Sequence, residues 1–351
     1  MHNARGRGHR GALALPLISL GLALSLYACR GGCSRAAPAP TAATGALSWF
    51  PADTHVVLSI DFARLRTTPL WSALGGLATS DPGDRQKIEE LAKRTGLDPL
   101  KQVDSLIVAF PEEARAQGSM GLILRGQGLD EARLVAYVRD QVSKQGDDLF
   151  SFRRAGRTLW ATRKEPTTAG FFVDARTFVL GAGGWAEKMA DLSAEATPKG
   201  ASMNPSLVHL VEQAGASRAV WAVALVPAAT RAALAADPTV PGAAGVNRLS
   251  LGIDIGAGVD AKLVADLATH AEAEAMAQQV RDAVVAAKRS PQVLLLGLAP
   301  YLDGISSRAA GVGCELTLRL SESQTTDAIE RLRAFLTLAR QPGAPGFPRP
   351  F

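Results

Sequence analysis

The sequence predicts an α+β protein whose two similar halves build mainly antiparallel sheets covered by helices. Short segments with alternating apolar and polar residues follow one another as hairpins after residue 50. Capped amphipathic segments with helical spacing lie between these hairpins. The same order of elements then returns about 142 residues later. Hairpins mixed with helices favour antiparallel sheets over a parallel α/β fold.

The first half opens with an expected strand over 55–62, which places Val56, Leu58 and Ile60 on one face. Asp81 and Pro82 are typical of a helix start, and Gly96 of its end. Asp130 is expected to cap a further helix. The remaining expected elements are strands over 103–110, 119–125, 149–152, 158–162, 171–173 and 177–180, and a helix over 185–192.

The second half repeats this order. The pair Thr269 and Glu272 forms a capping box that opens a long helix ending before Pro291. The expected strands cover 219–226, 248–255, 261–267 and 315–320, and a last helix covers 326–339. Two helices carry the clearest trace of duplication, since VRDQV at 138–142 is echoed by VRDAV at 280–284. The stripe Leu134, Val138 and Val142 corresponds to Met276, Val280 and Val284.

Each half therefore reads β-α-β-β-α-β with extra strands, the order of a ferredoxin-like split βαβ module. The expected boundaries are 49–200 for the first half and 201–340 for the second, followed by a disordered proline-rich tail over 341–351. The body is large enough to bury a sizeable core, either as one domain of two packed halves or as two domains.

The positive charge is confined to the start of the chain. Of 38 basic side chains, five arginines lie in residues 1–40, where there is no acid, so the rest balance the 33 acidic ones. Nucleic-acid binding needs basic side chains clustered on the folded body, so nucleic acid is not an expected partner. The local cluster Arg153, Arg154, Arg157, Arg163 and Lys164 is explained by two adjacent strands that face water.

The first 28 residues are typical of a secretory signal peptide. A short basic stretch precedes 17 uncharged, apolar residues over 12–28. As a helix, this run would span about 25 Å, less than the hydrocarbon core of about 30 Å, although an uncleaved anchor remains an alternative. Residues 29–48 are rich in Gly, Pro, Ala and Ser and predict a flexible tether with a reach of roughly 23 Å.

The sequence Leu26-Tyr27-Ala28-Cys29 resembles the lipobox of bacterial lipoproteins, although Tyr27 replaces the usual small residue. The resemblance implies cleavage before Cys29 and acylation, including palmitate, of its thiol and new amino group. Several acyl chains hold a protein stably on a membrane, whereas one holds it weakly. The implied location is the cell envelope, facing the periplasm. Arg30 in place of Asp resembles the signal for the outer rather than the inner membrane.

The body resembles duplicated α+β envelope lipoproteins of high-GC Gram-negative bacteria. The segments ADTHVVLSIDFARL, TTPLW and GLDPL carry this resemblance. No activity is attached to that group, so the resemblance implies no functional residue besides Cys29 as the lipid-attachment site.

Two glycine-rich motifs resemble nucleotide-binding patterns. Residues 181–186 fit G-x-G-x-x-A, but position 201, where an acid is needed, is Ala, so a tight strand-to-helix turn is the better explanation. Residues 251–258, with Asp254, resemble the first phosphate loop of sugar kinases and actin-like ATPases. The lengths of chain before and after the motif do not suit that family, and Asp254 fits a solvent-facing strand residue better.

The remaining chemistry-bearing residues form no recognisable motif. His55, His209 and His270 are spaced too far apart for a local zinc site. Cys314 is expected to be a small buried hydrophobe. Single carboxylates at Asp53, Asp61 and Asp104 flank strands and are explained as solvated strand ends. No catalytic residue, metal or cofactor is therefore predicted.

Three functions remain open. The first is a non-catalytic, membrane-tethered envelope protein that acts by binding, with a possible envelope protein partner, or by structure. The second is a carrier of a hydrophobic ligand. The third is a hydrolase whose residues converge only in the fold. A deep apolar pocket would favour the carrier, whereas a cleft joining His with an acid and Ser would favour the hydrolase.

Overall fold

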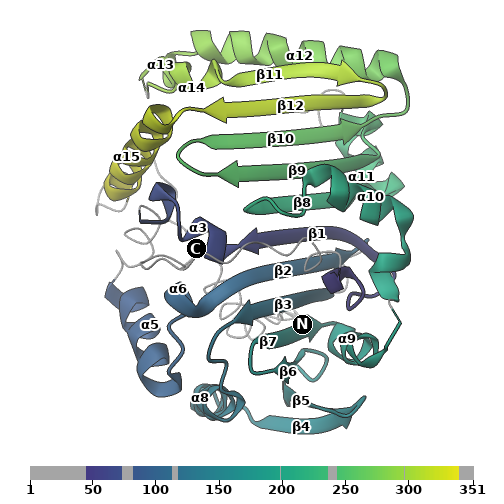
Figure 1. Cartoon of the computed structure of the whole chain (residues 1–351), viewed down its shortest axis with the longest axis vertical. Helices are drawn as coiled ribbons and strands as arrows, with labels where there is room; N and C mark the ends of the chain where they lie inside the picture. Colours follow the sequence, from purple (N-terminus) through teal and green to yellow (C-terminus); the bar gives the residue numbers. More distant parts are fainter. Residues whose placement is uncertain are drawn as a thin grey trace, which may run out of the picture.

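A computed structural model describes residues 45–72, 82–112, 118–197, 199–235, 243–295 and 297–339. The described residues form one twelve-stranded sheet flanked by helices, with each pair of neighbouring strands antiparallel (Figure 1). The prediction of an α+β protein with mainly antiparallel strands is confirmed. The signal peptide, Cys29, most of the expected tether and the proline-rich tail lie outside the described residues. The expectation that the tether extends to residue 48 is wrong, because Ala46 and Leu47 are fully buried in the main core.

The first half contributes seven strands in the order β1-β2-β3-β7-β6-β5-β4. Most begin and end within two residues of the alternating segments in the sequence, because alternation places one apolar row on each buried face. Their bounds are β1 Thr54–Asp61, β2 Val103–Pro111, β3 Met120–Gly126, β4 Leu149–Arg154, β5 Arg157–Thr162, β6 Ala169–Asp174 and β7 Thr177–Ala182.

The second half contributes five strands in the order β8-β9-β10-β12-β11. This order repeats β1-β2-β3-β7-β6, so the two halves share their strand arrangement as the repeated sequence pattern predicted. The halves join where β1 pairs with β8, with Val57 opposite Val223. The bounds are β8 Val220–Leu225, β9 Arg248–Ile255, β10 Val259–Asp266, β11 Ile305–Ala310 and β12 Gly313–Leu320.

The strands of each half are not arranged as a split βαβ module, although the elements follow the predicted order along the chain. A split module keeps its first two strands parallel and inserts an antiparallel strand between them, whereas here β1 pairs directly with β2 and β2 with β3, both antiparallel. Direct pairing of these three strands is favoured by their apolar residues, since Leu106 of β2 lies opposite Ile60 of β1 on one side and Leu124 of β3 on the other. This buries the apolar residues of β2 between neighbours in sequence.

Helices begin at the caps that the sequence indicates. Asp130 accepts a hydrogen bond from the backbone N–H of Arg133 at the start of α8 (Glu131–Lys144). Thr269 and Glu272 form both bonds of a capping box at α12 (His270–Arg289). The other helices are α3 Phe62–Leu65, α5 Pro82–Thr95, α6 Pro99–Gln102, α9 Trp185–Ala194, α10 Pro205–Ala214, α11 Ala228–Ala235, α13 Pro291–Leu295, α14 Ala299–Leu302 and α15 Glu322–Ala339, with 3-10 turns η1 Gly200–Met203 and η2 Ala243–Gly245.

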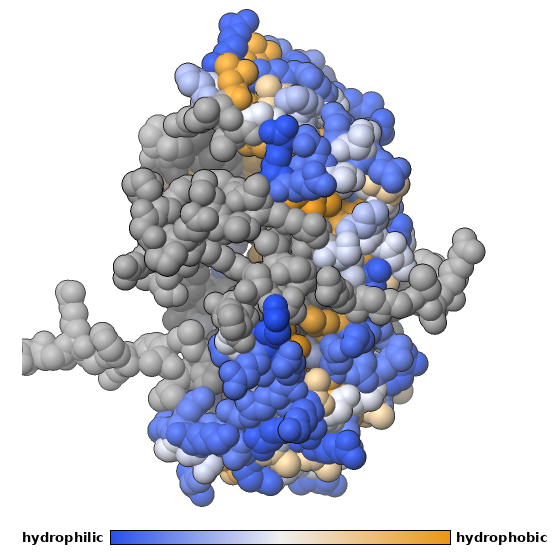
Figure 2. Space-filling model, turned by 90° about the vertical axis from the view of Figure 1, so that its left-hand side faces the viewer, coloured by the Kyte–Doolittle hydropathy of each residue, from blue (hydrophilic) through white to orange (hydrophobic). Residues whose placement is uncertain are grey.

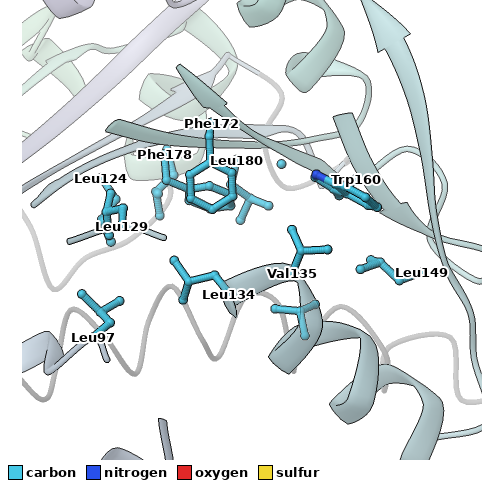
Figure 3. A pocket seen from close by; sticks show the side chains of 13 residues that line it. Leu97, Leu124, Leu129, Leu134, Val135, Leu149, Trp160, Phe172, Phe178 and Leu180 are labelled. Atoms are coloured by element: carbon cyan, nitrogen blue, oxygen red, sulfur yellow. The ribbon is translucent and has the colours of Figure 1, made fainter. Parts of the chain in front are cut away.

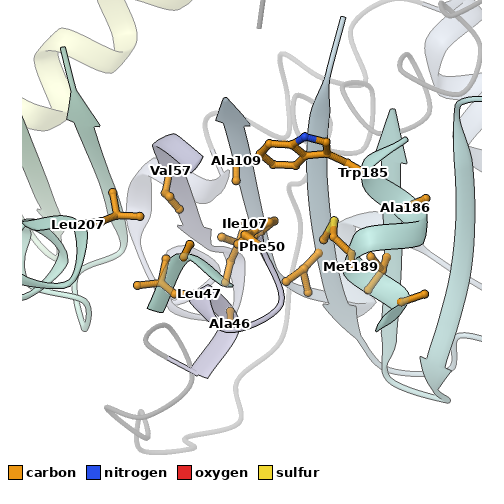
Figure 4. Packing of buried hydrophobic residues seen from close by; sticks show 14 of the residues in the cluster. Ala46, Leu47, Phe50, Val57, Ile107, Ala109, Trp185, Ala186, Met189 and Leu207 are labelled. Atoms are coloured by element: carbon orange, nitrogen blue, oxygen red, sulfur yellow. The ribbon is translucent and has the colours of Figure 1, made fainter. Parts of the chain in front are cut away.

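One face of the sheet carries the main core. Ile107, Ile123, Val179 and Phe171 face one another in register across β2, β3, β7 and β6, and each is at least 96% buried. The helices α9 and α10 close this face, with Met189 among the side chains that reach the sheet (Figure 4). The opposite face is packed by α8 at one end of the molecule and by α12 at the other (Figure 1).

The outer surface is mainly hydrophilic. Figure 2 shows blue side chains over the end of the molecule that holds α5 and α8. A small apolar patch lies at the other end, near α13, where Leu294 is 57% exposed. No helix among the described residues is both long and apolar enough to span a bilayer.

Candidate ligand-binding site

The residues that the sequence singled out do not converge on one centre. The two glycine motifs lie in different halves of the sheet, in β7 and β9. The three described histidines are also separated: His55 lies in β1, His209 lies in α10 and His270 starts α12. Within the described ranges, no group of three or more His, Cys, Asp or Glu side chains is placed to hold a metal ion.

The glycines at 181–184 form a tight strand-to-helix turn. A Cβ at Gly181 would lie 2.1 Å from the backbone N of Ala186. Gly183 and Gly184 have φ angles of 61° and 79°, in the left-handed region that favours glycine. The structural explanation of this motif is therefore confirmed.

Asp254 takes part in an ion pair between the two halves. Arg64, which follows β1, places Nη2 2.8 Å from a carboxylate oxygen of Asp254 on β9. This pair borders a shallow open hollow between the β9–β10 turn and the end of β12. An arginine of the same chain thus engages the carboxylate that a phosphate loop would direct toward a bound metal ion.

The single carboxylates and the cysteine considered in the sequence analysis have structural roles. Asp61 accepts a hydrogen bond from the N–H of Arg64 and caps α3, and Asp104 pairs with Arg66 at 2.7 Å. Asp53 lies 3.7 Å from Lys188. Cys314 is 97% buried as expected, and desolvation raises the pKa of its thiol. A buried thiol with a raised pKa is a poor nucleophile.

Among the described residues, an apolar cavity lies between α8 and the sheet of the first half. Its volume is about 100 Å³, and its lining is apolar throughout. Figure 3 shows an elongated space with Leu97 and Leu129 toward one end and Trp160 and Leu149 toward the other. The remaining lining residues are Leu122, Leu124, Leu134, Val135, Val138, Gly170, Phe172, Phe178 and Leu180.

The floor of the cavity consists of two neighbouring register rows of the sheet. In the first row Leu122, Leu180, Gly170 and Trp160 face one another across β3, β7, β6 and β5. The second row runs through Leu124, Phe178 and Phe172. The row of large residues is interrupted at Gly170, and the ring of Phe178 from the second row lies where a side chain of residue 170 would be.

Polar contacts hold α8 over this floor. The indole Nε1 of Trp160 donates a hydrogen bond to Oε1 of Glu131 at 3.2 Å. On the other side, Arg94 of α5 donates to Asp140 at 2.6 Å and lies over the ring of Tyr137. Hydrogen bonds from Lys144 and Arg94 hold the pKa of Asp140 below its usual value. The helix is thus attached at its edges while its apolar stripe faces the cavity.

The corresponding helix of the second half packs closely instead. The backbone of α12 is in close contact with β11 and β12, whereas α8 approaches the sheet closely chiefly at β4. Small residues permit the approach of α12, since Ala273 and Ala277 are at least 99% buried. Ser307 of β11 donates a hydrogen bond to the carbonyl of Ala277 at 2.7 Å. The two halves share a plan, and the described cavity lies in the first.

Comparison with known proteins gives a weak likeness of fold. No protein-family model matches the chain, and no curated protein matches it. Among solved structures, crystal form III of TP0453 is similar, with a TM-score of 0.45, 12% identity and coverage of 82% of this chain and 97% of that one. Crystal form IV has a TM-score of 0.43, 11% identity and coverage of 83% and 96%.

Proposed function

We propose that this protein is a non-catalytic envelope lipoprotein that binds an apolar ligand beneath α8. The observation that carries the proposal is the cavity itself, because all 13 residues that line it are apolar or glycine. Ligand sites are typically concave and mostly apolar, with few polar groups. The hydrolase alternative has less support, since the described histidines lie on separate elements.

The size of the cavity suits a short length of hydrocarbon. An engineered cavity of about 150 Å³ stays dry and binds benzene. At about 100 Å³, the space under α8 is of the same order. Each methylene group buried there contributes about 0.8 kcal/mol, so about five buried groups correspond to millimolar affinity and about ten to micromolar affinity. The elongated lining favours a linear chain over a compact ring (Figure 3).

The test uses 1-decanol, an uncharged linear ligand, and isothermal titration calorimetry. Val138 lines the cavity from α8, and Val138→Phe should fill it. Val285 on α12 is 48% exposed, so Val285→Phe is a matched control on the equivalent helix. We expect wild type and Val285→Phe to bind decanol and Val138→Phe to lose at least about tenfold in affinity, equal to about 1.4 kcal/mol.

Circular dichroism and thermal melting of all three proteins establish whether the variants are folded. A folded wild type that takes up no decanol contradicts the proposal. Equal affinity in folded Val138→Phe and Val285→Phe also contradicts it, because binding would then occur elsewhere.

The anchor is a separate part of the proposal and rests on the lipobox-like sequence before Cys29. Cells labelled with a fatty-acid analogue should incorporate label into the wild type and into Cys33→Ser, but not into Cys29→Ser. Membrane fractionation should place the labelled protein in the outer membrane. Equal labelling of wild type and Cys29→Ser overturns the anchor and leaves the proposal about the cavity intact.

A further inference from the structure

Two arginines without acidic partners among the described residues lie near the Trp160 end of the cavity. The guanidinium of Arg139 on α8 lies 5.5 Å from the centre of the Trp160 ring. Arg139 is exposed and forms no ion pair with any residue that the structure describes. Its position one helical turn after Val135 places it beside the apolar stripe that covers the cavity.

A second arginine lies on the same face of the sheet. Leu149, Ser151 and Arg153 alternate along β4, and Leu149 lines the cavity. Ser151 is paired in register with Trp160, and Arg153 follows about 7 Å further along the strand. Arg153 donates a hydrogen bond to the hydroxyl of Thr158 at 3.1 Å and has no acidic partner within the described ranges. It therefore adds to the positive charge near Trp160.

Asp140 and Asp148 of the surrounding elements have cationic partners, whereas Glu131 and Asp147 accept hydrogen bonds from uncharged N–H groups and keep their negative charge. Glu131 accepts the hydrogen bond from the Trp160 indole. Asp140 is bound by Lys144 and Arg94, and Asp148 pairs with Arg163 at 3.3 Å. Asp147 accepts hydrogen bonds from the backbone N–H groups of Asp148 and Lys164.

Other arginines of the same hairpin are also engaged. Arg154 makes a two-pronged bond to Asp191 on α9, with distances of 2.8 and 2.6 Å. Arg157 contacts the hydroxyl of Ser193 and lies 5.8 Å from the centre of the Phe171 ring. The basic cluster seen in the sequence is thus divided between the two faces of the sheet. Besides Arg157, Arg153 and Lys164 are the members without an acidic side-chain partner among the described residues, and Lys164 donates from Nζ to the carbonyl of Gln145 at the end of α8.

We infer that the ligand of the cavity is an anionic amphiphile. Its hydrocarbon chain lies between α8 and the sheet, and its negatively charged head lies at the Trp160 end, against Arg139 and Arg153. This inference rests on the proposed function and adds the class and the orientation of the ligand. A neutral or cationic head would leave both arginines without a counter-charge.

The experiment compares four ligands with the same ten-carbon chain, each below its critical micelle concentration. Decanoate and decyl phosphate carry anionic heads, 1-decanol a neutral head and decyltrimethylammonium a cationic head. Calorimetry with wild type should rank either anionic ligand above decanol and the cation last. The two anionic ligands distinguish a carboxylate from a phosphate head, and tighter binding of either one supports the inference.

The variants Arg139→Gln and Arg153→Gln test the orientation. Each should weaken the preferred anionic ligand about two- to fivefold and leave decanol within about twofold of wild type, as expected for an exposed ion pair. Arg289→Gln on α12 removes the same charge far from the cavity and is the control. Added salt should weaken the anionic ligand in wild type and have little effect on decanol.

The outcomes separate the inference from the proposed function. If decanol binds in the cavity but neither anionic ligand binds more tightly, the inference is wrong while the apolar site stands. If the anionic ligand binds tightly yet Arg139→Gln and Arg153→Gln behave as Arg289→Gln does, the inferred orientation is wrong. If none of the four ligands binds folded protein, the proposed function itself fails.

Discussion

Val135 and Ala277 occupy equivalent positions in the two halves, 142 residues apart, but their surroundings differ. Ala277 is 1% exposed, and its carbonyl accepts a hydrogen bond from Ser307 on the sheet. Val135 is 8% exposed and borders the cavity under α8. One position in the repeated pattern therefore serves close packing in one half and an apolar site in the other.

Enlarging these two side chains should change the unfolding free energy by different amounts. Ala277→Leu places three more carbons where α12 meets β11, and overpacking of this kind costs about 1–3 kcal/mol of unfolding free energy. Val135→Leu adds one methylene toward open space and should change stability by less than about 1 kcal/mol. Urea denaturation of both variants measures the difference. Equal losses would show that α8 and α12 are packed alike.

Gly170 should determine how much of the cavity is open. A Cβ at this position would lie 2.6 Å from Cζ of Phe178, the far end of a side chain that can move. Gly170→Ala is expected to push the Phe178 ring into the cavity and weaken decanol binding, with little loss of stability. Gly256→Ala is the control, because a Cβ there meets no atom within 4 Å. Unchanged affinity in Gly170→Ala, measured by calorimetry, would contradict this role.

Gly181 should be required for stability and not for nucleotide binding. A Cβ at Gly181 would meet backbone atoms of Ala186 at 2.1 and 2.6 Å, and backbone yields less readily than a side-chain tip. Gly181→Ala is expected to lower the unfolding free energy by about 1–3 kcal/mol. The melting temperatures of wild type and of Gly181→Ala should not change when a dinucleotide is added. A melting temperature of wild type that rises with dinucleotide would support the rejected alternative.

The ion pairs of Glu315 predict a dependence of stability on pH. Hydrogen bonds from Lys262 and Arg308 lower the pKa of Glu315 on β12. A carboxylate with a lowered folded pKa stabilises the protein above its unfolded pKa of about 4.3, and this contribution is lost as the pH falls through the folded value. The unfolding free energy of Glu315→Gln should therefore be about 1 kcal/mol below that of wild type at pH 7, and the two should become similar below about pH 3. Urea titrations at both pH values measure the difference, and a gap that persists in acid would contradict the assignment.

Alternating segments and caps were sufficient to predict most of the sheet. The strand β9 carries unbroken alternation, β10 departs from it at Val264, and the helix α12 carries both halves of a capping box. The edge strand β11 was missed because its sequence, ISSRAA, has one large apolar residue. An edge strand has a partner on one side and is stabilised here by its register with β12, from Ile305 opposite Leu318 onward. Such pairing depends on distant residues and leaves little local signal.

The cavity could not be predicted from the sequence. Leu134 and Val138 appeared as the core stripe of an amphipathic helix, which they also are. Whether such a stripe meets filled or open space depends on the distance between helix and sheet. The one local signal was Gly170, a residue without a side chain in a strand that otherwise carries large apolar residues. The pairing of Gly170 with Leu180 and Trp160 depends on the register of distant strands, which the local sequence does not indicate.

The antiparallel junction of β1 with β8 also constrains how this protein could be dissected. A fragment that ended between α9 and α10 would leave Val57 and its neighbours on an uncovered strand edge, ready to pair with a foreign chain. The two halves of the sheet should therefore unfold together in a single thermal transition. We therefore expect that neither half is stable on its own.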